Sequence, residues 1–188
     1  MANIARNVST GKPKISGAVY RAPLGTSVPT DATTSLSGAF IALGFVSEDG
    51  LENENDMEVS EIKAWGGVIV YRSLDGLTDN FKLTLIESKN VNVLKAVYGD
   101  SNVTVDGSGN AHVAIKAEDP VEAVWVFELA LRGGVAKRIV IPDGAITARE
   151  PITYNDSDAI GYGITISAYP DSNSKTHDEY IEADTVSG

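Results

Sequence analysis

The sequence contains no cysteine, which excludes disulfide bonds, a thiol nucleophile and any metal site built on thiolates. Its two histidines, His112 and His177, each stand alone, so the sequence does not assemble a histidine metal site or a catalytic triad. No phosphate-binding glycine loop is present, because neither Gly66-Gly67 nor Gly133-Gly134 has the required lysine and strand-to-helix setting. We therefore predict no catalytic residue, no metal, no cofactor and a protein that is not an enzyme.

Long apolar runs and basic charge are also scarce. No segment is long enough and apolar enough to span a bilayer, and residues 1–7 do not lead into the apolar stretch of a signal peptide, so we expect neither a membrane partner nor Sec-type secretion. Acidic residues outnumber basic residues 26 to 15, for a net charge of −11. Such a surface repels phosphate groups, which argues against a nucleic-acid binder but suits a channel whose wall must not hold DNA.

What remains is a series of short apolar segments divided by turn residues. With 188 residues, 43% of them hydrophobic, the chain is large enough for one domain with its own core. Asn90 suits the N-cap of a helix over 91–98 that ends at Gly99. Expected strands cover 15–21, 40–46, 61–72, 81–86, 102–105, 111–117, 121–131, 135–141, 145–150 and 160–169. This pattern predicts a mainly β fold, an antiparallel β-sandwich or barrel with one short flanking α-helix.

Three parts follow from this layout. We expect residues 1–14 to form an N-terminal arm, residues 15–170 the sandwich, and residues 171–188 a polar C-terminal tail with Tyr180 and Ile181 as candidate anchors.

Several residues within the sandwich have two readings. Gly66 and Gly67 lie inside an expected strand, where they indicate a bulge or the close approach of another backbone. Trp125 lies on the apolar alternation of 121–131 and is expected in the core, whereas Trp65 fits either a core position or a subunit contact. The turn 106–110 resembles a calcium loop but lacks its bidentate glutamate, so a hairpin turn is favoured.

The most distinctive segment, 47–60, is acidic and contains no basic residue. Its like charges oppose collapse onto its own domain, so we predict an unstructured arm that reaches a neighbour, with Leu51 and Met57 as apolar anchors. The residues expected to make this contact are Glu48, Asp49, Leu51, Glu52, Glu54, Asp56, Met57 and Glu58. Basic residues that could receive the arm are Lys12, Lys14, Arg21, Lys137, Arg138 and Arg149, and the sequence does not choose among them.

Several segments, spread in order from about residue 12 to 181, together resemble the major tail tube proteins of long-tailed, siphovirus-type bacteriophages. They are GAVYRAP (17–23), LGFVSEDGL (43–51), IKAWGG (62–67), VLKAVYGD (93–100), WVF (125–127), KRIVIP (137–142) and ITISAYP (164–170).

The resemblance implies a structural virion protein that is assembled in the host cytoplasm and located in the virion tail. It implies homo-hexameric rings stacked around a tape-measure protein, with the tail terminator and distal tail proteins as further partners. Double-stranded DNA would pass through the negative lumen without specific binding. In that family a long loop between two inner strands reaches the adjacent ring, and the segment 47–60 occupies the corresponding place.

Three questions stay open in the sequence. Glu122 and Glu128 lie opposite the Trp125 side of their strand, so they face either the lumen or an outer solvent surface. The inner tube of a contractile tail or injection system shares the implied architecture. A carbohydrate-binding β-sandwich is a further alternative, although aromatic residues make up only 7% of the chain and form no evident binding platform.

Overall fold

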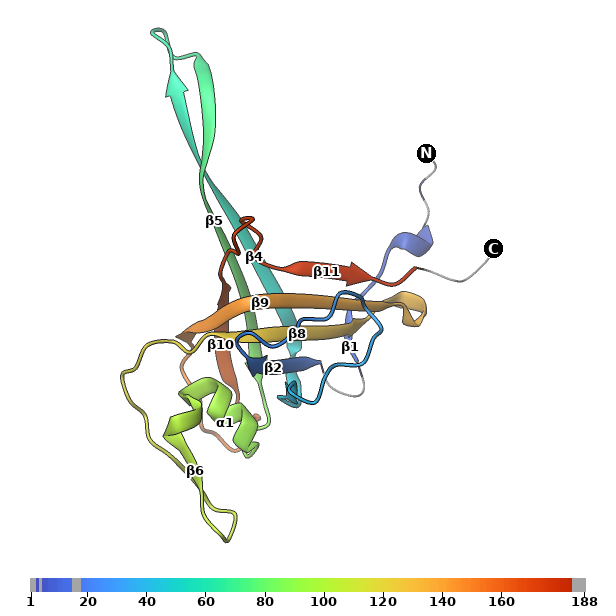
Figure 1. Cartoon of the computed structure of the whole chain (residues 1–188), viewed down its shortest axis with the longest axis vertical. Helices are drawn as coiled ribbons and strands as arrows, with labels where there is room; N and C mark the ends of the chain where they lie inside the picture. Colours follow the sequence, from blue (N-terminus) through green and yellow to red (C-terminus); the bar gives the residue numbers. More distant parts are fainter. Residues whose placement is uncertain (1–2, 4, 15–17, 184–188) are drawn as a thin grey trace.

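The computed structural model describes residues 3, 5–14 and 18–183 (Figure 1). The strands are β1 (Lys12–Pro13), β2 (Val19–Pro23), β3 (Ile41–Ala42), β4 (Val46–Lys63), β5 (Ile69–Leu85), β6 (Val103–Val105), β7 (Ala111–Val113), β8 (Ala123–Ala130), β9 (Ala136–Arg149), β10 (Tyr162–Ala168) and β11 (Asp178–Ile181). The helices are α1 (Val91–Tyr98) and the 3₁₀ turns Ala5–Asn7, Asp100–Asn102 and Arg132–Gly134.

One antiparallel sheet dominates the described residues. Its strands follow the order β3-β2-β8-β9-β10-β5-β4, with β1 added to β8 and β11 added to β9, while β6 and β7 form a separate hairpin. The sheet curls until Phe81 of β5 stacks on Phe127 of β8, with 5.7 Å between ring centroids. Trp125 is buried beside them and donates its indole Nε1–H to the Gly144 carbonyl at 2.9 Å. The predicted mainly β, antiparallel fold and the core position of Trp125 are confirmed.

Helix α1 has the predicted boundaries because its end signals are local. The Asn90 Oδ1 accepts from the Asn92 amide at 2.9 Å, and Gly99 takes a φ of 98°, which favours glycine. The helix buries Val93, Leu94 and Val97 against the curled sheet. Val91, Ala96 and Tyr98 are partly buried and pack against the same core.

Two predicted strands, 135–141 and 145–150, are one continuous strand, β9. Pro142 does not end it, because the pairing with β8 shifts between Ala123 and Trp125, and such an irregularity accommodates a residue that cannot donate to the ladder. The predicted strand 40–46 is mostly irregular, with β3 limited to Ile41–Ala42.

Both terminal segments join the sheet. Lys12 and Pro13 pair with Ala130 and Leu129 of β8, and Tyr180 and Ile181 lie in β11, which pairs with β9. Of the strand predicted over 15–21, residues 15–17 lie outside the described residues.

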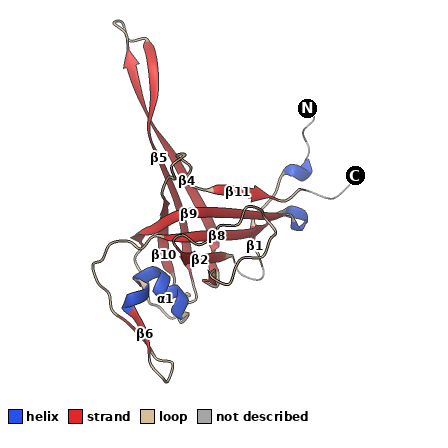
Figure 2. Ribbon diagram, in the orientation of Figure 1, coloured by secondary structure: helices blue, strands red, loops and turns tan. Residues whose placement is uncertain are grey.

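The largest correction concerns 47–60, which is not an unstructured arm but most of the 18-residue strand β4. Likewise 61–72 is not one strand, because the chain turns at 64–68, where Gly66 and Gly67 have φ values of 100° and 89°. Together β4 and β5 form a long hairpin that projects far from the rest of the molecule (Figure 2). The alternation of acidic residues with a period of two, at Glu52, Glu54, Asp56 and Glu58, was the strand signal that the net charge obscured.

Candidate assembly surface

The projecting hairpin leaves the body of the molecule at Asp79. On one side of this point the β5 side chains of Phe81, Leu83 and Leu85 are buried in the core, whereas residues 69–78 are all exposed or partly exposed. On β4 the projecting part runs from Asn55 to Lys63, which corresponds to roughly 30 Å at the usual rise per strand residue. The hairpin therefore extends well beyond the core that its own chain provides.

Asp79 fixes the root of the hairpin. Its buried carboxylate accepts from the Asn53 amide at 2.8 Å and the Thr176 hydroxyl at 2.5 Å, and lies 2.6 Å from Nδ1 of His177. Burial would raise the pKa of Asp79, but these hydrogen bonds and the charge of His177 together hold the pKa below its ordinary value. The C-terminal segment thus braces the point where the hairpin departs.

One face of the hairpin continues the core-facing side of the sheet. Met57 is paired with Leu77 and Val59 with Leu74, and all four side chains are exposed, Met57 by 68% and Leu74 by 60%. We call these four residues the apolar stripe. Contiguous apolar side chains left in water mark surfaces that another protein covers.

The opposite face carries charge. Glu52, Glu54, Asp56 and Glu58 alternate along β4 and form what we call the acidic stripe. Lys82, paired with Glu52 in the ladder, lies 2.7 Å from the Glu54 carboxylate, and its pKa is raised by the hydrogen bond and charge of Glu54.

The hairpin ends in an apolar, basic tip, residues 62–72. It contains two basic residues, Lys63 and Arg72, and no acidic residue, although Arg72 pairs with Glu61 at 3.0 Å. Trp65 at the turn is fully exposed, and Val68 and Val70 beside it are largely exposed. Of the two readings of Trp65, a core position is therefore excluded within this chain.

The basic residues proposed to receive the arm are mostly occupied within their own subunit. The residue pairs are Lys14 with Glu128 at 2.9 Å, Arg21 with Asp100 at 3.0 Å, Lys137 with Glu179 at 2.8 Å, Arg138 with Glu128, and the Arg149 guanidinium 5.5 Å from the Tyr98 ring centroid. Lys12 on β1 is exposed. Five of the six candidates thus hold this chain together.

Glu128 does not face solvent, which corrects both of its predicted positions. It is 4% exposed and pairs with Lys14 and with the buried Arg138, which also donates to the Asp31 carbonyl at 2.8 Å. A sequence signal for this pair exists. A hairpin turn centred on Gly133 sets residue 128 opposite residue 138. Glu122, just before β8, is exposed.

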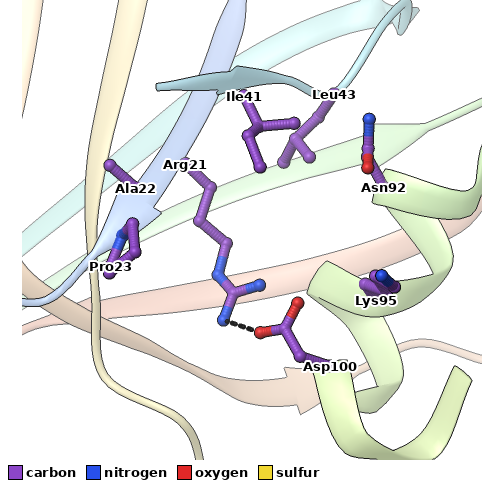
Figure 3. Close-up of a pocket in the computed structure, with 8 residues that line it drawn as sticks. All are labelled: Arg21, Ala22, Pro23, Ile41, Leu43, Asn92, Lys95 and Asp100. Carbon is purple, nitrogen blue, oxygen red and sulfur yellow. Dashed lines mark hydrogen bonds and ion pairs between the residues drawn. The ribbon is translucent and has the colours of Figure 1, made fainter. Parts of the chain in front are cut away.

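Among the hollows of the described surface, two adjoin the strands discussed above. The smaller, about 130 Å³, lies between β2, β3 and α1, and the Arg21–Asp100 ion pair crosses it (Figure 3). The larger, about 480 Å³, lies at the start of β4, and we call it the base hollow. Its apolar walls are Val46, Leu51, Leu83, Phe127 and Leu129, and the exposed carboxylates of Glu48 and Asp49 lie on its rim.

Neither hollow gathers catalytic chemistry. Across residues 3, 5–14 and 18–183, no group of three or more histidines and carboxylates is arranged to hold a metal ion. Within the same residues, none of the helices has the length and apolar character needed to cross a membrane.

The features that stand out are instead surfaces suited to contact with other protein: an apolar stripe, an exposed tryptophan and a hollow of matching character. No curated protein is significantly similar to this chain. The model of the phage tail tube protein family, however, matches residues 14–188, nearly the whole sequence. The chain belongs to the phage tail tube protein family, and is accordingly a structural protein of the virion tail and not an enzyme.

Proposed function

We propose that copies of this chain form hexameric rings that stack into the tail tube through which DNA is delivered. The observation that carries this proposal is the apolar stripe on the projecting hairpin. The same sheet face that buries Phe81 in the body exposes Met57 and Leu74 outside it. Leaving these side chains in water forgoes about 1.5–3 kcal/mol each, which a neighbouring copy recovers by covering them.

Ring closure would use the free edge of the sheet. Strand β4 ends the strand order, so its outer edge has no strand partner among the described residues. A long open edge is a template for pairing with another chain, and closing a ring of identical copies removes such edges. Stacking would then place the tape-measure protein, and later double-stranded DNA, inside the ring, with the terminator and distal tail proteins at the tube ends.

The acidic stripe is our candidate for the lumen wall. On the same sheet face lie Thr165 and Ser167 of β10, and the Ser167 hydroxyl donates to Asn80 of β5 at 2.7 Å. This face is therefore polar and net negative, which suits a wall that DNA must slide past. Glu122 stays a second candidate, whereas Glu128 is withdrawn because it is buried and paired.

The predicted inter-ring residues are reassigned in part. Met57 belongs to the apolar stripe, and Glu48, Asp49 and Leu51 line the base hollow, so these four keep a role in contact between copies. The four residues of the acidic stripe move to the lumen.

Shortening the hairpin tests the proposal. In the variant, residues 57–77 are replaced by Asn-Gly, which joins the paired residues Asp56 and Thr78 through a two-residue turn. We expect a folded subunit, judged by circular dichroism and thermal unfolding, that forms no tubes in negative-stain electron microscopy, whereas the unaltered protein forms tubes of six-fold rings. Shortening the turn 106–110 between β6 and β7 is the matched control and should leave tubes intact. Normal tubes from the shortened hairpin would refute the proposal.

A further inference from the structure

The two ends of the hairpin carry features that fit one another. At the tip, the Ala64 amide donates to the Val68 carbonyl at 2.7 Å and the Gly67 amide to the Ala64 carbonyl at 2.9 Å. These bonds define the turn that holds Trp65 fully exposed. An indole has the largest contact area of any side chain and dominates the interfaces that bury it, so a defined turn that presents one outward indicates a binding anchor.

The base hollow offers an apolar seat for such an anchor. Leu83 and Phe127, both buried, form its walls together with Val46, Leu51 and Leu129. Its volume of about 480 Å³ lies within the range of roughly 300–1,000 Å³ found for pockets that hold drug-sized ligands, so one indole fits with room for part of the adjoining turn.

Charge favours the same pairing. Lys63 lies two residues before Trp65 in a tip without acidic residues, and Glu48 and Asp49 lie exposed on the rim of the hollow. Opposite charges around an apolar centre steer and orient an encounter between proteins. The hairpin therefore presents a basic residue, Lys63, at its tip. Glu48 and Asp49 at its base are the acidic residues that would receive this charge.

The arrangement along the hairpin decides which copy is the occupant. The tip lies at one end of the β4–β5 ladder and the start of β4 at the other (Figure 1), and the base hollow is at the start of β4. From Leu51 to Lys63 the chain advances 12 residues, or roughly 40 Å of strand. A tip therefore cannot reach the hollow of its own chain. Contact between two different surfaces on identical copies gives a ring where the rotation closes and an open stack where it does not, and the joining of one ring to the next is the open case.

From these observations we infer that Trp65 docks into the base hollow of the copy in the next ring, with Lys63 beside Glu48 and Asp49. The inference rests on the proposed stacking of rings and names the contact that joins them. It assigns the role of receptor to the base hollow, where Leu83, Phe127 and Leu129 join the predicted contact residues Glu48, Asp49 and Leu51.

Cross-linking tests the contact, since the chain has no cysteine of its own. The double variant Ala64→Cys, Glu48→Cys places one thiol at the tip and one on the rim, both at exposed positions. A short bismaleimide added to assembled tubes should give a ladder of covalent multimers on denaturing gels. The matched control, Ser108→Cys with Glu48→Cys, moves the first thiol to the β6–β7 turn and should give monomers. Tubes of the first variant without a ladder would overturn the inference.

A charge exchange gives a second, independent measurement that does not depend on cysteine variants assembling. Lys63→Glu should raise the concentration needed for half-maximal tube assembly at least tenfold. Adding Glu48→Lys and Asp49→Lys should restore assembly to within about threefold of the unaltered protein. Failure of this restoration would contradict the docking. If the unaltered protein itself forms no tubes, the proposed function fails instead, so the two failures are distinguishable.

Discussion

Strands β4 and β5 run through both the curled body and the projecting hairpin, yet their apolar side chains are largely buried in the first and exposed in the second. Along one face of β5, Phe81, Leu83 and Leu85 are buried, whereas Leu77 and Leu74 farther out are exposed. The side chains have the same chemistry and point to the same side of the sheet. What differs is whether the chain itself supplies the opposing layer, and in the proposed assembly a neighbouring copy supplies the layer that the hairpin lacks.

The largest expected effect comes from the core of the body. Trp125→Ala removes a buried indole and leaves the Gly144 carbonyl without its donor. We expect a loss of about 3–5 kcal/mol in the free energy of unfolding, measured by urea denaturation of the isolated subunit. Leu74→Ala on the hairpin is the control and should change it by less than about 0.5 kcal/mol. Equal losses for both substitutions would mean that the comparison between body and hairpin fails.

The buried ion pair should give the next largest effect. Arg138→Met leaves the Glu128 carboxylate with only Lys14 as a basic partner, so we expect a loss of about 3 kcal/mol in subunit stability. Changing both partners, Arg138→Met with Glu128→Leu, should recover most of it, because no uncompensated buried charge remains. Denaturation curves of the two variants check this, and an unaltered stability for Arg138→Met would show that the pair is not buried in solution.

Trp65 should show the reverse behaviour, with no effect on the subunit and a large effect on assembly. Trp65→Ala is expected to leave the unfolding curve unchanged, since the side chain has no contact in its own core. The concentration for half-maximal tube formation should rise at least tenfold, measured by sedimentation, because anchor tryptophans dominate interfaces. The concentration for half-maximal tube formation by Trp65→Phe should lie between the values for the unaltered protein and Trp65→Ala. A destabilised subunit that assembles normally would contradict this prediction, because Trp65 would then stabilise its own chain and not the assembly.

The root of the hairpin should respond to acid. The pKa of Asp79 is lower in the folded chain than its ordinary value of 3.8. The stability it contributes is therefore fully present above pH 3.8 and is lost as the pH falls through the lower, folded-state value. Asp79→Asn should flatten the decline of unfolding free energy below about pH 4. An unchanged pH profile in this variant would show that Asp79 does not brace the hairpin.

The smallest effect on the subunit is expected from the acidic stripe. Replacing Glu52, Glu54, Asp56 and Glu58 by lysine should change subunit stability by less than about 1 kcal/mol, since exposed charges contribute little. Tubes built from it should instead retain double-stranded DNA at low salt and release it at high salt. The serine variant of the same four positions is the neutral control. If tubes of the lysine variant do not retain DNA at low salt, the acidic stripe does not line the lumen.

The sequence predicted those elements whose signals are local. Asn90 and Gly99 define both ends of α1, and the alternation around Trp125 and Ile164 identifies β8 and β10. The hairpin was missed because β4 faces no core of its own over most of its length, and an apolar pattern is the main signal by which strands are recognised. Its conformation comes from the ladder with β5, which a linear pattern does not display.

The candidate assembly surface was likewise predicted only in part from the sequence. The sequence predicts a contact between the segment 47–60 and a neighbour, and this stays a prediction. Our proposal places the main contact at the tip, at Trp65, and not along the charged stem. The sequence also left the base hollow unseen, since that surface combines β1, β2, β4, β5 and β8, which come together only through folding.

The pairing of β4 with β5 slips twice in the projecting part, between Glu58 and Val59 and between Ile62 and Lys63. Each register shift increases the local right-handed twist of the ribbon, so the tip is rotated about the ribbon axis relative to the root. Identical copies joined tip to base would inherit that rotation at every step. The assembled filament would then be a screw with a defined pitch, and its rotation per layer would be set by two irregularities in a single ribbon.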